Sequence, residues 1–274
     1  MEWVDWIGGD SWYESRDVVP MVPAVAREVL EFSTDPEVPA KKITGVVSKD
    51  PVLATRVLQL ANSAHSASAV QITSIENAVV RMGTNSVRNV VTAVCVASIL
   101  TDKGAYGTKG RDLIDHGIGT AYVAWLLADA VGGPRDEAFV CGLLHDIGKL
   151  LIRQLAHRPH AGVKKPSADE VSTVLDERHA AFGGQLLRAW HLPPALYNAV
   201  AFHHAPDQSP ESNAAAVAYA ANRLAHRYGF GCPVEEFDPL TDAVFPALRV
   251  DEAALVRIEK QARKMYDVAR QLSA

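Results

Sequence analysis

The spacing of apolar residues is the feature of this sequence that most constrains its fold. Apolar side chains recur three or four positions apart along most of the chain, as in Val22, Val25 and Val29, which places them on one helical face. No run shows the convincing period-two alternation of a half-buried strand. Hydrophobic residues make up 48% of the 274 residues, enough to build a sizeable core. The sequence therefore predicts an all-α fold.

Local start and stop signals divide the chain into helices. Asp50 followed by Pro51 is typical of a helix start and predicts a helix from 51 to about 64. Ser74 opens a short helix that ends near Gly83, and the nearly all-round apolar segment 86–100 predicts a central helix packed on several sides. Further helical patterns cover about 111–130, 135–144, 148–156, 167–190, 194–203, 212–228 and 252–273.

A polar, glycine-rich stretch at 101–110 is the best candidate for a boundary within the chain. It predicts an N-terminal tail (1–17), an N-terminal helical subdomain (18–100), a second helical subdomain (111–228) and a C-terminal extension with a final helix (229–274). The tail carries Trp3, Trp6 and Trp12. It is either a loose segment or one that packs back on the body or on a partner, and the sequence leaves these alternatives open.

Charge and cysteine content limit the compartment and the partners. There are 27 basic and 32 acidic residues, a net charge of −5, so we expect neither nucleic-acid binding nor membrane binding. Cys95, Cys141 and Cys232 form no CxxC pair, which favours a reducing compartment. The acidic, aromatic N-terminus does not resemble a signal peptide, and the apolar run 90–100 is too short to cross a bilayer. These features predict a cytoplasmic protein.

The string GLLHDIGK (142–149) carries the sharpest chemical signal. His145 beside Asp146 at a helix end brings an imidazole and a carboxylate to one place, ligands that suit divalent Fe, Mn, Zn or Mg. Gly148 permits a sharp turn, and Lys149 could reach an anion bound to the metal or serve an ordinary helix-end role. The alternative interpretation of the pair is a buried remnant in which imidazole and carboxylate satisfy each other by hydrogen bonds.

Other polar residues extend this signal. His116 lies one turn after Asp112, which we expect to orient it rather than to bind a metal. Of the adjacent His203 and His204, one should face the centre and one should face solvent or a neighbouring helix. The remaining histidines are expected on the surface: His65, His157, His160, His191 and His226. Arginines 56, 81 and 88 form either a basic face for a partner or nucleotide phosphate, or simply solvated charge.

The ordered histidines and their flanking strings resemble a known family. The set from His116 through His145-Asp146 and His179 to His203-His204 resembles the metal-site pattern of the HD superfamily of phosphohydrolases. The strings SKDPVLATRVLQLANSA (48–64), ITSIENAVVRMG (72–83) and HAAFGGQLLRAWHLPPALYNAVAFHH (179–204) resemble the HDOD domain, an HD-related output domain of bacterial signalling proteins. The resemblance covers about residues 20–228.

The resemblance implies an HDOD architecture, in which the N-terminal helical subdomain packs on an HD-like helical subdomain. It implies a divalent-metal site built from His116, His145, Asp146, His179, His203, His204 and Asn222. Asn222 stands where the HD pattern has an aspartate, and its neutral amide should weaken metal binding and remove a base. The glycine-tyrosine-proline motif of cyclic di-GMP hydrolases of the HD-GYP type is replaced by APDQSP (205–210).

Two functions follow from the resemblance and its departures. The first is a stand-alone, non-catalytic regulatory module of bacterial signal transduction that binds a ligand or a protein partner, with a nucleotide or cyclic nucleotide as the implied class of ligand. The alternative is a metal-dependent phosphohydrolase acting on a nucleotide, with Lys149 stabilising the developing charge.

Overall fold

The computed structural model describes residues 1–8, 38–48, 72–84, 103–157 and 161–273, with positions 28, 54–55, 57–58, 62, 87, 91 and 159. Across these residues the chain forms helices and connecting turns and no strand, which confirms the all-α prediction. The helices are α1 (Trp3–Gly8), α3 (Ala40–Val47), α5 (Ile75–Met82), α7 (Lys103–Ala130), α8 (Arg135–Leu144), α9 (Ile147–His157), α10 (Ala168–Ala189), α11 (Pro194–Ala201), α12 (Ser212–Tyr228), α13 (Val244–Ala247) and α14 (Glu252–Ser273). Short 3-10 turns cover Pro206–Gln208 and Pro239–Thr241. The predicted helices at 51–64 and 86–100 lie largely outside the described residues, as does the helical face of Val22, Val25 and Val29.

Several helix ends follow directly from local sequence. The Ser167 side chain accepts a hydrogen bond from the Glu170 backbone N–H, and the Glu170 carboxylate accepts one from the Ser167 N–H, a reciprocal cap that starts α10. Ser74 caps α5 as predicted, and Gly229 ends α12 in the left-handed conformation. α7 begins at Lys103 rather than near residue 111, because an established helix gains one hydrogen bond per added residue and can absorb the cost of glycines. The division into subdomains at 101–110 stays a prediction.

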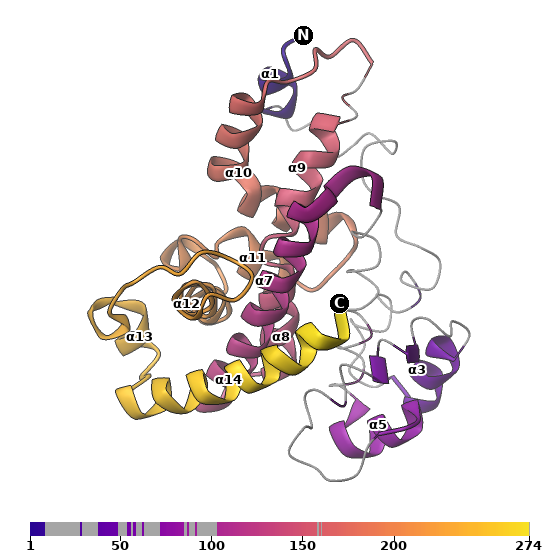
Figure 1. The fold of residues 1–274 in the computed structure, drawn as a ribbon, viewed down its shortest axis with the longest axis vertical. Coiled ribbons are helices and arrows are strands. Elements are labelled where there is room, and N and C mark those ends of the chain that lie inside the picture. Colours follow the sequence, from indigo (N-terminus) through magenta and orange to yellow (C-terminus); the bar gives the residue numbers. More distant parts are fainter. Residues whose placement is uncertain are drawn as a thin grey trace.

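Three apolar clusters form the interior of the described part. The first joins α1, α8, α9, α10 and α11, and the second joins mainly α7, α12, α13 and α14. The third lies between α3 and α5 and includes Ile43, Val46 and Val47 of α3. Figure 1 shows α7 running through the middle of the larger helical body, with α14 crossing one end and α1, α9 and α10 grouped at the other. The predicted site residues come from elements of both the first and second clusters.

The start of the N-terminal tail packs back on the body. Trp3 is 1% exposed and Trp6 is also buried, and both belong to the first apolar cluster. Arg178 on α10 donates a hydrogen bond to the Ile7 carbonyl, and Lys164 forms an ion pair with Glu2. Of the alternatives for this tail, residues 1–8 therefore take the packed one, while the rest of it, including Trp12, lies outside the described residues. Within the described part, no helix has the length and apolar character needed to cross a membrane.

Candidate metal centre

A close approach of two helices positions the His-Asp pair. α8 ends at Leu144, His145 and Asp146 form the turn, and α9 begins at Ile147. A Cβ on Gly148 would collide with the carbonyl oxygen of His179 and lie 2.6 Å from the Gly183 nitrogen on α10. Only glycine lets α9 start this near to α10, so Gly148 brings the Asp146 turn beside His179.

Asp146 lies at the middle of the cluster, with its side chain 5% exposed. Its Oδ1 is 3.2 Å from Nε2 of His179 and 3.8 Å from Nε2 of His203. Its Oδ2 is 3.4 Å from Nε2 of His145 and accepts a hydrogen bond from Lys149 Nζ at 2.7 Å. Three imidazoles and one ammonium, from the α8–α9 turn, α9, α10 and the end of α11, therefore surround a single carboxylate.

The imidazoles share one hydrogen-bonding pattern and therefore one tautomer. In each of four histidines, Nδ1 lies within hydrogen-bond distance of a backbone carbonyl, which can only accept, so Nδ1 carries the proton and Nε2 keeps a lone pair. The pairs are His116 with Phe230 at 2.9 Å, His145 with Gly142 at 2.8 Å, His179 with Leu175 at 2.6 Å and His203 with Val200 at 2.7 Å. The fixed tautomers give each ring the form in which neutral histidine binds a metal.

His116 and Asn222 close another side of the cluster. The His116 ring stands 5.1 Å from the ring of His145, centroid to centroid, and its Nε2 is 3.0 Å from Oδ1 of Asn222. Two acceptors at this distance repel each other unless a cation lies beside both or the amide turns its NH₂ toward the ring. The neutral Asn222 side chain therefore offers an oxygen to a cation in one orientation and covers the His116 lone pair in the other.

His203 and His204 point in different directions, as the sequence predicted. His203 is fully buried and faces Asp146, which confirms the inward histidine of the pair. His204 lies at the exposed rim against the neighbouring α10, where its Nε2 is 3.0 Å from Nε2 of His179. His179, His203 and His204 form one group whose ligand atoms lie close enough together to hold a cation, and His116, His145 and Asp146 form another.

Burial controls the charges of the cluster. Burial, together with the nearby His145, lowers the pKa of His116 to about 4, and burial lowers the pKa of His203 well below its usual value. Burial and His179 lower the pKa of His204 to about 4. Burial alone would raise the pKa of Asp146, but the nearby histidines and Lys149 hold it well below its usual range. At neutral pH the rings of His116, His203 and His204 are therefore neutral, and Asp146 is a carboxylate.

Three buried atoms of the centre have no hydrogen-bond partner among the described residues: Nε2 of His145, Nε2 of His203 and Oδ1 of Asp146. Buried polar atoms are ordinarily satisfied, and three acceptors beside one another are a set that a positive charge can satisfy. Nitrogen and carboxylate oxygen are ligands for borderline and hard divalent ions. The residues present therefore fit a divalent cation. A proton competes with that cation for the lone pair of each imidazole.

Some expectations about individual side chains were wrong. Asp112 is exposed, and it does not orient His116, because the Phe230 carbonyl and Asn222 take both ring nitrogens. His226 is not an ordinary surface residue, since its ring lies 4.8 Å from the His116 ring and its side chain is only 25% exposed. His157 and His191 are exposed as predicted, and Arg81 is exposed on α5. His65, His160, Arg56 and Arg88 lie outside the described residues.

Together, the helical fold and this histidine-aspartate cluster define a protein of the HD-related, all-α class. The match to the family model for the HDOD domain covers residues 19–206, and the chain belongs to that family. Asn222, His226 and Cys232 lie beyond the matched residues.

The chain is also similar to individual proteins. A crystal structure of a candidate phosphohydrolase from Shewanella amazonensis SB2B is 25% identical, with a TM-score of 0.73 over 95% of this chain and 98% of that chain. A Treponema pallidum protein without an assigned function is 27% identical over 206 residues, which cover 71% of this chain and 39% of the relative. Ribonuclease Y of Clostridium perfringens is 33% identical over 95 residues, which cover 35% of this chain and 15% of the enzyme. The matches span less than two-fifths of the length of these two curated relatives.

Proposed function

We propose that this chain is a regulatory HDOD module whose histidine-aspartate centre binds a divalent cation and, through it, recognises a ligand or partner without hydrolysing it. The observation that carries the proposal is the common tautomer of the buried imidazoles. Each donates from Nδ1 to a backbone carbonyl and aims an uncovered or weakly covered Nε2 toward the cluster.

The cation would be held by Asp146 with His145, His179 and His203, and by His116 when Asn222 leaves it free. Neutral imidazoles with one carboxylate suit divalent Fe, Mn or Zn better than Mg, which prefers an all-oxygen shell. A bound cation of this kind would supply positive charge that attracts and polarises a phosphate or carboxylate group.

Two contacts support binding rather than hydrolysis. Asn222 provides a neutral oxygen 3.0 Å from His116, where a carboxylate would add charge to the centre and accept a proton from water. Lys149 donates to Asp146 Oδ2 at 2.7 Å, which satisfies the carboxylate oxygen that could otherwise serve as a base. Among the residues that the structure describes, the centre has its ligands but no second free carboxylate beside Asp146.

The rim of the centre supports an anionic ligand. Lys149 is 29% exposed and stands beside Asp146, and His204 lies at the exposed edge against His179. An ammonium next to a bound cation favours phosphate, so a nucleotide or cyclic nucleotide is the ligand class we propose. A protein partner in bacterial signalling, reached by contact with this module, completes the proposal.

A second candidate function is a metal-dependent phosphohydrolase acting on a nucleotide. Lys149 beside the centre favours it, because an ammonium there could stabilise charge that develops on phosphate. The likeness to a candidate phosphohydrolase, and over 95 residues to ribonuclease Y, also supports phosphoester chemistry as an alternative.

Nucleotide binding and turnover separate the two functions. The chelated and the Mn²⁺-, Fe²⁺- or Zn²⁺-loaded protein would be assayed with cyclic di-GMP, nucleoside phosphates and a generic phosphodiester. The proposal expects metal-dependent binding of a nucleotide with no turnover by the parent. Asn222→Asp should bind metal about 10- to 100-fold more tightly, since it restores a carboxylate at the edge of the centre. Turnover by the loaded parent that disappears in Asp146→Asn would contradict the regulatory proposal and establish the enzyme.

A further inference from the structure

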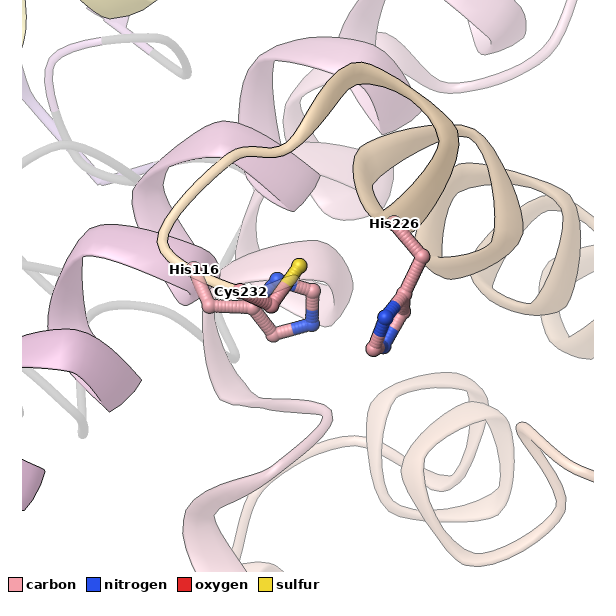
Figure 2. A group of neighbouring side chains, drawn as sticks. All are labelled: His116, His226 and Cys232. Carbon is pink, nitrogen blue, oxygen red and sulfur yellow. The ribbon is translucent and has the colours of Figure 1, made fainter. Parts of the chain in front are cut away.

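A second group of metal-ligating side chains lies beside the first. It consists of His116 on α7, His226 on α12 and Cys232 in the loop after α12, and one ligand atom from each lies within 4.8 Å of the others. Figure 2 shows the three side chains converging from these separate elements. His226 and Cys232 play no part in the centre around Asp146, so this group requires its own explanation.

The loop that carries Cys232 is built against α7. Gly229 and Gly231 both take positive φ, at 71° and 65°. A Cβ on Gly231 would collide with the backbone nitrogen of His116, so the loop touches the helix at this point only because residue 231 has no side chain. The contact places the Phe230 carbonyl on Nδ1 of His116 at 2.9 Å and holds the next residue, Cys232, beside the same ring.

Two members of the group, Cys232 and His226, have ligand atoms without a strong hydrogen bond among the described residues. Cys232 is a free cysteine whose Sγ makes one weak contact, 3.9 Å from the Ala225 carbonyl. Nδ1 of His226 is buried and makes no hydrogen bond within the described part, although Glu235 Oε1 is 3.2 Å away. A carboxylate beside a ligand imidazole is the arrangement that commonly orients histidine toward a metal. His226 and Cys232 are only partly buried, which leaves an entry path for an ion on their side of the buried His116.

We propose that His116, His226 and Cys232 form a binding site for a thiophilic divalent cation of the zinc class. In a tetrahedral zinc site, ligand atoms stand roughly 3.3 to 3.6 Å apart, so atoms that lie within 4.8 Å of one another need to draw together by at most roughly 1.5 Å. Rotation of the partly exposed His226 and Cys232 side chains can supply that movement. The thiol proton is released to solvent as the Sγ–metal bond forms, and a thiolate with two imidazoles selects zinc over magnesium or manganese.

The two sites compete for one imidazole. Nδ1 of His116 is committed to the Phe230 carbonyl, so Nε2 alone can bind a metal, and it can serve only one ion at a time. The centre around Asp146 offers nitrogen and oxygen, whereas this site offers sulfur and nitrogen. A thiophilic ion at Cys232 would therefore draw His116 away from the first centre. The site itself does not depend on the proposed function of that centre.

Cobalt substitution tests the site in the full-length protein. Co²⁺ bound to thiolate gives a sulfur-to-cobalt charge-transfer absorption in the near ultraviolet that imidazole and carboxylate sites lack. The parent should show this band at saturation, and Cys232→Ser and His226→Gln should lose it. Cys141→Ala, which removes a buried cysteine of the core, is the matched control and should keep it. Asp146→Asn should also keep the band, so failure of the first centre is distinguishable from failure of this one.

A second measurement needs no variant. Mass-spectrometric mapping would compare maleimide labelling of Cys232 in the parent with excess Zn²⁺ and with chelator. The site predicts strong protection of Cys232 by Zn²⁺. Absence of the charge-transfer band in the cobalt-saturated parent, a band that survives in Cys232→Ser, or equal labelling with and without Zn²⁺ would each overturn the proposal.

Discussion

In the metal-free protein, replacing His116 by asparagine should make the free energy of unfolding fall less when the pH is lowered into mild acid. Burial lowers the pKa of His116 from 6.5 to about 4, so the folded protein resists protonation there while the unfolded chain accepts it. The unfolded state thus binds more protons between these two values, and the free energy of unfolding falls as the pH falls through that window. Asparagine does not titrate, and it keeps an N–H donor for the Phe230 carbonyl.

The size of this effect follows from the two pKa values of His116. The difference between a pKa of 6.5 and one of about 4 corresponds to a loss of about 3 kcal/mol in the free energy of unfolding once the pH is below both values. Most of this loss has occurred by about pH 4.5. His203, whose pKa is also lowered, is present in both proteins and contributes equally. Asp146 has a lowered pKa, so its contribution is lost only in stronger acid, outside this window.

Urea unfolding with chelator, at a series of values from about pH 7.5 to about pH 4.5, measures the difference. The unfolding free energy of His116→Asn should fall by about 2 to 3 kcal/mol less than that of the parent. His191→Asn, at an exposed position outside the cluster, controls for the removal of a histidine as such. Equal losses in the parent and His116→Asn would refute the assignment of a neutral, buried imidazole at this position.

Other substitutions probe the packing that positions the centre. Gly148→Ala should lower the unfolding free energy by about 2 to 3 kcal/mol in urea melts, because the new methyl group overlaps the backbone of α10. Gly45→Ala, with no atom within 4 Å of the added Cβ, should instead raise it by about 0.5 to 1 kcal/mol, and a loss as large as that of Gly148→Ala would contradict the geometry. Ser167→Ala should cost about 1 kcal/mol through loss of the α10 cap, and an unchanged melt would argue against that cap. Trp3→Ala should weaken docking of α1 by about 3 kcal/mol, seen as faster amide exchange in that helix, and unchanged exchange would contradict its burial.

Helix positions were predictable where the signals are local. The bounds predicted for α12 and α14 match the structure, because apolar spacing marks the bodies of these helices and Gly229 ends α12. The start of α7 was missed because the stretch from 101 to 110 contains three glycines and reads as a loop. A helix that continues from a packed segment overrides that local preference.

The cluster was predictable from the ordered histidines, but its surroundings were not. His226 follows Asn222 by four residues on α12, so their shared helical face was a signal available in the sequence. The Phe230 carbonyl and Cys232 reach His116 only through a loop pressed against a helix more than a hundred residues earlier. The one-turn spacing of Asp112 and His116 gave a plausible pair, but spacing alone does not show which partner a buried ring selects.

Metal content, measured after reconstitution with Mn²⁺ and removal of excess ion, tests the central claim most directly. Mn²⁺ disfavours thiolate ligands, so it reports the centre around Asp146 rather than the Cys232 site. The account predicts stoichiometric Mn²⁺ in the parent, loss of it in Asp146→Asn and His145→Ala, and retention in the exposed-site control His191→Asn. A parent that holds no Mn²⁺ above background, or an Asp146→Asn variant that holds as much as the parent, would contradict a metal centre at this cluster.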